Sequence, residues 1–154
     1  MKQLSLLSVD PPKSDVATAP RSTSAIGARA ELAVAGALCK AGFAVFTPFF
    51  NAHGRIDVLY ESERTGVRRV QCKSAHYKND VVMFYTRSHT GGIERGYAGD
   101  VDEFGVYSEH TGLVYLVPVE LVTARLTYLR AAPTRNSQQR GVRWAKDYVL
   151  GPPW

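Results

Sequence analysis

The sequence predicts an α/β fold, with a mixed sheet of four to six strands and a helix packed on one face of it. Three observations lead to this prediction. Residues 25–41 are rich in alanine at helical spacing and are followed by Gly42. Short apolar segments with strand-like alternation follow, separated by glycine and polar turns. Among them, residues 56–61 and 67–74 predict a β-hairpin whose connection ends at Gly66.

The length and composition suit one compact domain. The chain has 154 residues, of which 45% are hydrophobic. We expect residues 1–21 to form a flexible leader, because prolines interrupt them and apolar side chains are sparse. Residues 22–150 are expected to form a single domain with a basic C-terminal segment, and residues 151–154 a short tail. The formal net charge of +5 favours a polyanionic partner.

The cysteines and the apolar segments indicate where the chain acts. Cys39 and Cys72 fit no zinc-binding spacing and are expected as thiols in a reducing compartment. No apolar run approaches the roughly 20 residues that a membrane span needs. The apolar residues 4–7 are too few for the core of a signal peptide. The sequence therefore predicts a cytoplasmic protein with no membrane partner.

The helix carries the first candidate site residue. A hydroxyl among residues 22–24 is expected to cap its N-terminus. Its apolar stripe is made of Gly27, Val34 and Leu38. Glu31 falls on the same stripe, where a carboxylate is costly unless a cation or a basic side chain lies beside it. We expect Glu31 to face a metal ion; the alternative is an ion pair with Arg29, Arg55 or Lys73.

The elements after the helix follow from turn residues and alternation. Before the hairpin we expect a buried strand at 43–50 that loosens at Pro48, and a loop at 51–54. The later elements are expected as a polar loop at 76–80, a strand at 81–86, a mobile loop at 87–96, strands at 101–107 and 113–119, a helical turn at 120–124 and a strand at 126–129.

The hairpin carries the central candidate site. Side chains alternate along a strand, so Asp57 lies on the face opposite its apolar neighbours, and Gln71 and Lys73 share one face. Antiparallel pairing brings these three side chains within reach of each other. A carboxylate, an amide carbonyl and an ammonium suit a hard divalent cation with a water beside it. The alternative is two ordinary strands with polar residues on a solvated face.

Two further segments leave alternatives open. Asp100 and Asp102 share a face and form a rival metal site, although we favour their pairing with arginine. After residue 133, basic and amide side chains alternate with Trp144 and Tyr148, which is typical of a nucleic-acid surface. The alternative is that these aromatic side chains close the core while the charges stay solvated.

The motifs RAELAV, GRIDVLY, RVQCKSA, GYAGDVDEFGVY and RWAKDY, in this order, resemble the PD-(D/E)XK nuclease superfamily. Within it, the QxK motif is most similar to the group I intron homing endonuclease-like branch. Archaeal Holliday junction resolvases are similar more distantly. The resemblance runs from about residue 25 to 148. It implies a restriction-endonuclease-like mixed sheet flanked by helices, and a DNA endonuclease that uses Mg²⁺, with Mn²⁺ as a substitute.

The resemblance also implies the roles of residues. Asp57 matches the metal-binding aspartate, Gln71 the second acidic position and Lys73 the motif lysine. Glu31 matches the helix glutamate, and the backbone carbonyl of Cys72 would be a further metal ligand. The catalytic set is therefore Glu31, Asp57, Gln71 and Lys73. Gln71 removes one negative charge, which implies weaker metal binding or a larger part for Glu31.

The expected partner is double-stranded or branched DNA. Its expected contacts are Arg55, which stands where many relatives have the motif proline, together with Arg87, Arg95, Arg135, Arg140 and Arg143. Cutting two strands needs two active sites, so we expect a homodimer or homotetramer. Two alternatives stay open. One is a structure-selective Holliday junction resolvase, and the other is a catalytically inert nucleic-acid-binding module, which Gln71 favours.

Overall fold

The computed structural model describes residues 22–50, 54–133 and 138–151. The expected leader and most of the expected tail lie outside these residues. The helix α1, Thr23–Lys40, begins where the sequence predicts, because the Ser22 hydroxyl accepts the N–H of Ala25 at 3.2 Å. Gly42 takes a left-handed conformation with φ of 89° directly after the helix. Within the described residues, no helix is long and apolar enough to cross a membrane.

The strands follow in an order close to the prediction. They are β1 Ala44–Phe46, β2 Val58–Ser62, β3 Gly66–Lys78, β4 Val81–Tyr85, β5 Ser88–Thr90, β6 Ile93–Arg95, β7 Glu103–Ser108, β8 Leu113–Pro118, β9 Leu126–Arg130 and β10 Val149–Leu150. Short 3₁₀ helices occupy Val119–Leu121, which overlaps the start of the expected helical turn at 120–124, and Ala145–Asp147.

The central sheet has the order β1-β2-β3-β7-β8-β10, and β4 joins β3 to β9. The β3–β7 pair is parallel and the other pairs are antiparallel, so the sheet is mixed as predicted. It has eight strands where four to six were expected. One reason is that residues 76–78, expected in a polar loop, continue β3 and pair with β4. The expected loop at 87–96 also contains a hairpin, β5–β6.

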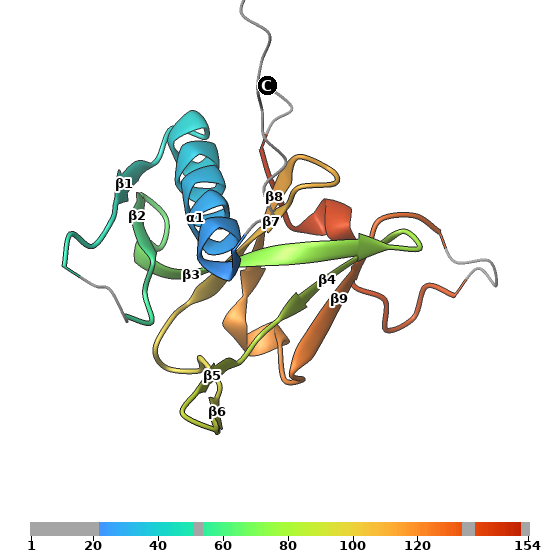
Figure 1. The fold of residues 1–154 in the computed structure, drawn as a ribbon. Helices are drawn as coiled ribbons and strands as arrows, with labels where there is room; N and C mark the ends of the chain where they lie inside the picture. Colours follow the sequence, from blue (N-terminus) through green and yellow to red (C-terminus); the bar gives the residue numbers. More distant parts are fainter. Residues whose placement is uncertain (1–21, 51–53, 134–137, 152–154) are drawn as a thin grey trace, which may run out of the picture.

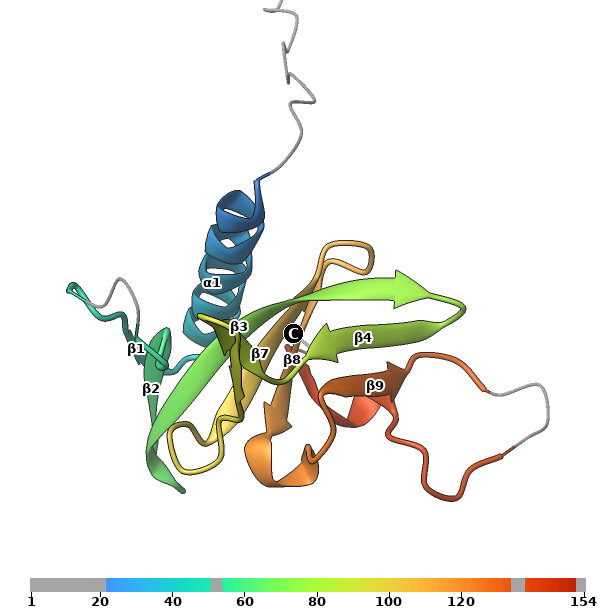
Figure 2. The same cartoon turned by 60° about the horizontal axis from the view of Figure 1, so that its bottom comes forward.

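The two faces of the sheet bury different clusters. Helix α1 lies across β3 and β7 on one face, and β4 and β9 extend away from it (Figures 1 and 2). The cluster on the helix side contains Val34, Leu38, Val58, Tyr60, Val70, Cys72 and Val114. The cluster on the other side includes Phe84, Tyr97, Phe104, Tyr115 and Leu129. Val70 and Cys72 therefore face the helix, and the alternation turns Gln71 and Lys73 to the opposite face.

Strand β1 and the C-terminal segment differ in burial. Strand β1 is not the buried strand that was expected, because it lies at the sheet edge and Phe46 is 53% exposed. At the C-terminal end, Ala145 is buried and Tyr148 packs against the core. The Tyr148 carbonyl accepts the N–H of Leu116 at 2.8 Å. The segment after residue 138 therefore closes the core, which was one of the two interpretations.

Gly105 on β7 sets how closely the helix approaches the sheet. A Cβ atom there would lie 2.6 Å from Cγ1 of Val34 and 3.0 Å from Cγ1 of Val70. Both valines are fully buried, and valine is stiff at its first side-chain torsion. A larger residue would therefore push α1 away from β3 and β7.

We predict that Gly105→Ala lowers the free energy of unfolding by about 1–3 kcal/mol, the usual cost of overpacking a core. The matched control is Gly36→Ala in α1, where a Cβ meets nothing within 4 Å. That variant is expected to gain about 0.5–1 kcal/mol, because alanine favours helix over glycine. Urea denaturation of both variants measures the difference. Equal stability of Gly105→Ala and the wild type would contradict the close packing.

Candidate active site

The pairing of β2 and β3 places Asp57. Val58 lies opposite Val70, and the N–H of Asp57 donates to the Val70 carbonyl at 2.9 Å. Asp57 thus continues the ladder one residue before β2, which begins later than the predicted strand. Its Oδ2 accepts the backbone N–H of Cys72 at 2.8 Å and also the side-chain amide N–H of Gln71. The structure therefore brings Asp57 and Gln71 together as the alternation predicts, and the backbone of Cys72 joins them.

Gln71 holds an unusual buried acceptor. The side chain is 8% exposed, and its Nε2 faces both Asp57 Oδ2 and, at 3.3 Å, the Cys72 carbonyl. Its Oε1 is buried and has no hydrogen-bond partner among the described residues. A half-turn of the amide exchanges Nε2 and Oε1, which would put three oxygens side by side. Such an arrangement needs a cation, so the donor set fits a divalent metal with oxygen ligands.

Lys73 lies on the same face of β3 as Gln71. Its Nζ donates to the phenolic oxygen of Tyr97 at 3.0 Å. Tyr97 is 6% exposed and comes from the segment between β6 and β7. The sequence does not predict Tyr97 as a site residue, because it lies outside any helix or strand, where periodicity does not indicate the direction of a side chain.

Glu31 lies near Asp57, but it is exposed and does not sit on the buried stripe as expected. Ala30, Val34 and Leu38 form that stripe instead. Partial burial raises the pKa of Glu31, and the negative charge of Asp57 raises it further. The basic side chains considered as its partners bind elsewhere: Arg29 to Glu109 at 3.4 Å, Arg55 to Asp100 at 2.6 Å, and Lys73 to Tyr97.

Burial also governs the electrostatics of Asp57. It raises the pKa of this carboxyl, and this effect outweighs the opposing hydrogen bonds from Cys72 and Gln71 and the positive charge of Lys73. Asp57 and Glu31 are thus two acidic groups that both hold protons more tightly than usual. Among the described residues, no three His, Cys, Asp or Glu side chains gather as a metal cluster. A cation here would rely on the carboxylates together with amide and backbone oxygens.

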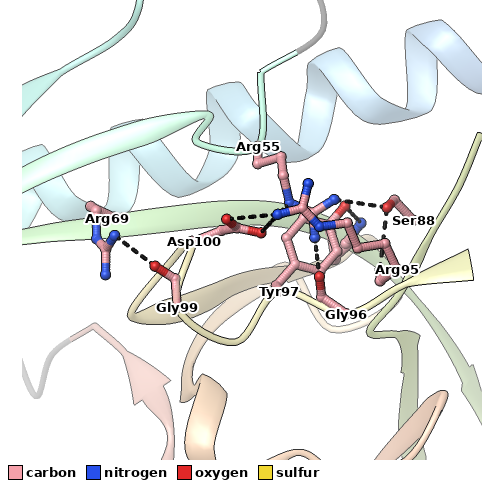
Figure 3. A network of polar contacts seen from close by, with 9 residues as sticks. Arg55, Arg69, Ser88, Arg95, Gly96, Tyr97, Gly99 and Asp100 are labelled. Carbon is pink, nitrogen blue, oxygen red and sulfur yellow. Dashed lines mark hydrogen bonds and ion pairs between the residues drawn. The ribbon is translucent and has the colours of Figure 1, made fainter.

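Asp100 and Asp102 pair with arginine, as the sequence analysis favours. The Arg69 guanidinium binds Asp102 through two contacts, Nη2–Oδ1 at 2.9 Å and Nε–Oδ2 at 3.1 Å. This pairing lowers the pKa of Asp102. Asp100 binds Arg55 and, at 3.1 Å, Arg95 (Figure 3). Their carboxylates are therefore occupied by guanidinium groups.

The arginines expected to contact nucleic acid have several different surroundings. Arg55 donates to Ser88 Oγ at 2.9 Å and to the Gly96 carbonyl, so it faces protein groups. The others stand as follows: Arg87 lies 3.9 Å from Glu94, Arg95 binds Asp100, Arg143 donates to the Leu121 carbonyl at 2.7 Å, and Arg140 is exposed. Arg135 lies outside the described residues. Their predicted contacts with nucleic acid stay predictions.

A sequence model of the PD-(D/E)XK endonuclease family matches residues 21–150. The chain belongs to this family. Among solved structures it is similar to the bacterial homing endonuclease I-Ssp6803I, with a TM-score of 0.68 and 22% sequence identity. The match covers 84% of this chain and 89% of that one. It confirms the restriction-endonuclease-like α/β fold. No curated protein sequence matches the chain.

The raised pKa of Asp57 predicts how stability depends on pH. As pH rises above about 4, the carboxyl loses its proton in the unfolded chain first, so ionisation favours unfolding. In EDTA at neutral pH, Asp57→Asn is therefore expected to have a higher Tm than the wild type. The difference in Tm between this variant and the wild type should disappear as pH falls below about 4. Thermal unfolding followed by circular dichroism across pH measures it.

Asp102→Asn is the matched control, since Arg69 lowers the pKa of that carboxyl. The negative charge of Asp102 stabilises the folded protein at neutral pH and is lost in acid, so the effect of the substitution on Tm has the opposite sign to that of Asp57→Asn. Asp102→Asn should melt below the wild type at neutral pH, with the gap again closing in acid. An Asp57→Asn gap that does not change with pH would contradict the assignment to ionisation.

Proposed function

We propose that this PD-(D/E)XK endonuclease is a Mg²⁺-dependent DNA endonuclease of the homing-endonuclease-like type. The observation that carries the proposal is the cluster of Asp57 Oδ2, the Cys72 carbonyl and the Gln71 amide, whose buried Oε1 has no partner among the described residues, with Lys73 on the same strand face. Oxygen donors of this kind match the preference of Mg²⁺, and Mn²⁺ accepts similar ligands.

The residues that would hold the ion are Asp57, Gln71 through its side-chain oxygen, Cys72 through its carbonyl, and Glu31 from α1. When bound, Mg²⁺ supplies a Lewis acid that lowers the pKa of a coordinated water and offsets charge at a phosphate. Asp57 and Glu31 both have raised pKa values without a cation, so their ionisation and cation binding favour each other.

Lys73 is the residue of this site that can hold or deliver a proton to the reacting groups. Its ammonium can donate a hydrogen bond to a phosphate oxygen or hold the attacking water. The neighbouring peptide N–H of Cys72 is already bound to Asp57, which keeps the carboxylate in place. The nucleophile is water, so the proposal needs no covalent link between the chain and the DNA.

Two strands of DNA and one site per chain imply that copies of the chain act together, as a homodimer or homotetramer. The net charge of +5 suits a polyanionic substrate. The alternative is a catalytically inert binding module. Gln71 favours it, because glutamine has no negative charge with which to attract a cation. The junction-resolving activity remains a second alternative. Cleavage of a plasmid and of a four-way junction, with and without Mg²⁺, separates all three.

We predict that supercoiled plasmid carrying the cognate site is cut with Mg²⁺ and not with EDTA. Lys73→Ala should slow cleavage by roughly 100- to 10,000-fold, the usual contribution of a proton-transfer group. Asp57→Ala should abolish cleavage, because it removes the main protein ligand of the Mg²⁺ ion. The control is Lys78→Ala, which removes an exposed lysine from the same strand. Cleavage rates on gels measure the effects.

A synthetic four-way junction of arbitrary sequence is tested beside the plasmid. Because the cognate site is not known, plasmid libraries that carry randomised sequences are tested as well. Cutting of the junction alone would favour the resolvase. DNA binding that is salt-dependent, with no cutting of any substrate and no effect of Asp57→Ala, would establish the inert module and contradict the enzyme.

We predict that Gln71→Glu tightens Mg²⁺ binding on the order of tenfold or more, because a second full charge faces the ion. Without metal, the same change should lower Tm, since it places a carboxylate beside Asp57 and removes the Nε2 donor. Calorimetric Mg²⁺ titration and thermal unfolding in EDTA measure both effects. Gln138→Glu, on an exposed segment, is the control for added charge. Unchanged Mg²⁺ affinity would contradict the placement of the ion at Gln71.

A further inference from the structure

The ammonium of Lys73 donates a hydrogen bond to the hydroxyl of Tyr97. Nζ lies 3.0 Å from the phenolic oxygen of Tyr97 and 4.6 Å from the centroid of its ring. The first distance is that of an ordinary hydrogen bond, and the second lets the ring face add a cation–π contact. Lysine has a flexible four-carbon stem, so an ammonium without such a partner would sample many positions.

Tyr97 is itself held firmly. It is 6% exposed, and its ring meets Phe104 edge to face, with 5.5 Å between centroids. Its carbonyl accepts the N–H groups of Asp100 at 3.0 Å and Val101 at 3.2 Å, which forms a turn directly before β7. The hydroxyl therefore points from a fixed ring toward Lys73.

Arg55 connects this ring to the metal-binding end of the hairpin. Its guanidinium carbon lies 4.0 Å from the centroid of the Tyr97 ring. Asp100, Ser88 and the Gly96 carbonyl surround the guanidinium (Figure 3). Arg55 precedes Asp57 by two residues. One side chain thus ties the segment that carries Tyr97 to the segment that carries the candidate metal ligand.

We propose that Tyr97 is the positioning residue for Lys73, and that Arg55 aligns the Tyr97 ring for this purpose. The proposal rests on the proposed function, in which Lys73 acts on the reacting groups. Because Tyr97 is buried, its hydroxyl acts through Lys73 and leaves DNA binding unchanged. In this proposal Arg55 contacts Tyr97 inside the protein, whereas the sequence analysis expects Arg55 to contact DNA.

The test is Tyr97→Phe, which removes the hydroxyl and keeps the ring in the core. The single-turnover cleavage rate should fall roughly 10- to 100-fold, the size expected for one hydrogen bond to a charged group. DNA affinity measured with Ca²⁺ should not change. The matched control is Tyr115→Phe, since Tyr115 is 1% exposed in the same cluster and its hydroxyl contacts Thr111 at 3.3 Å. That variant should cut at the wild-type rate.

A double-mutant cycle shows whether the hydroxyl acts through the lysine. In a Lys73→Met background, Tyr97→Phe should cause no further loss of rate, because the group it positions is gone. Additive losses would overturn the proposal, and so would a Tyr97→Phe enzyme that cuts at the wild-type rate.

A second readout needs neither metal nor DNA. In ¹⁵N-labelled protein at low temperature, the Lys73 ammonium should give an Nζ–H cross-peak, because its hydrogen bond to Tyr97 slows proton exchange with water. Lys73→Arg assigns the peak. Tyr97→Phe should abolish it and Tyr115→Phe should keep it. A peak that survives Tyr97→Phe would overturn the proposal. If the wild type cuts no DNA, the nuclease proposal fails and this comparison still decides whether Tyr97 holds Lys73.

Discussion

The register between β2 and β3 is the constraint on which the rest of the site depends. Val58 opposite Val70 brings Asp57 beside Gln71 and the Cys72 amide, whose N–H fixes the carboxylate at 2.8 Å. A slip of one residue would turn Asp57 into the core and expose its apolar neighbours. The close approach of α1 at Gly105 then brings Glu31 near to Asp57. The parallel strand β7 follows the turn that delivers Tyr97 to Lys73.

In this site, hydrogen bonds partly offset the cost of burying carboxylates. Burial raises the pKa of Asp57 and of Glu31, so both charged carboxylates are disfavoured without a cation. A third carboxylate at position 71 would add repulsion. The amide of Gln71 instead donates to Asp57 Oδ2, and its Oε1 is buried without a partner among the described residues. Glutamine here thus satisfies the aspartate while keeping an oxygen that can bind an ion.

Alternation and helix signals were sufficient to predict α1 and the hairpin faces, because they depend on neighbours in sequence. They also predicted that Asp57 and Gln71 would meet. Long-range contacts decided the features that were missed. The extension of β3 depends on pairing with β4, and the position of Tyr97 depends on Arg55 and Phe104. Helical spacing allowed Glu31 on the buried stripe, but the packing of α1 on the sheet buries Ala30, Val34 and Leu38 and leaves Glu31 exposed.

Anomalous diffraction from crystals of the wild-type protein soaked with Mn²⁺ shows directly whether the β2–β3 hairpin binds a metal ion. We expect an anomalous peak between the Asp57 carboxylate and the Cys72 carbonyl, with the Gln71 amide turned so that Oε1 faces the ion. The Asp57→Ala protein should lose this peak. A peak at Asp100 and Asp102 instead, or a fully soaked crystal with no peak at Asp57, would contradict a metal-dependent site on the β2–β3 hairpin.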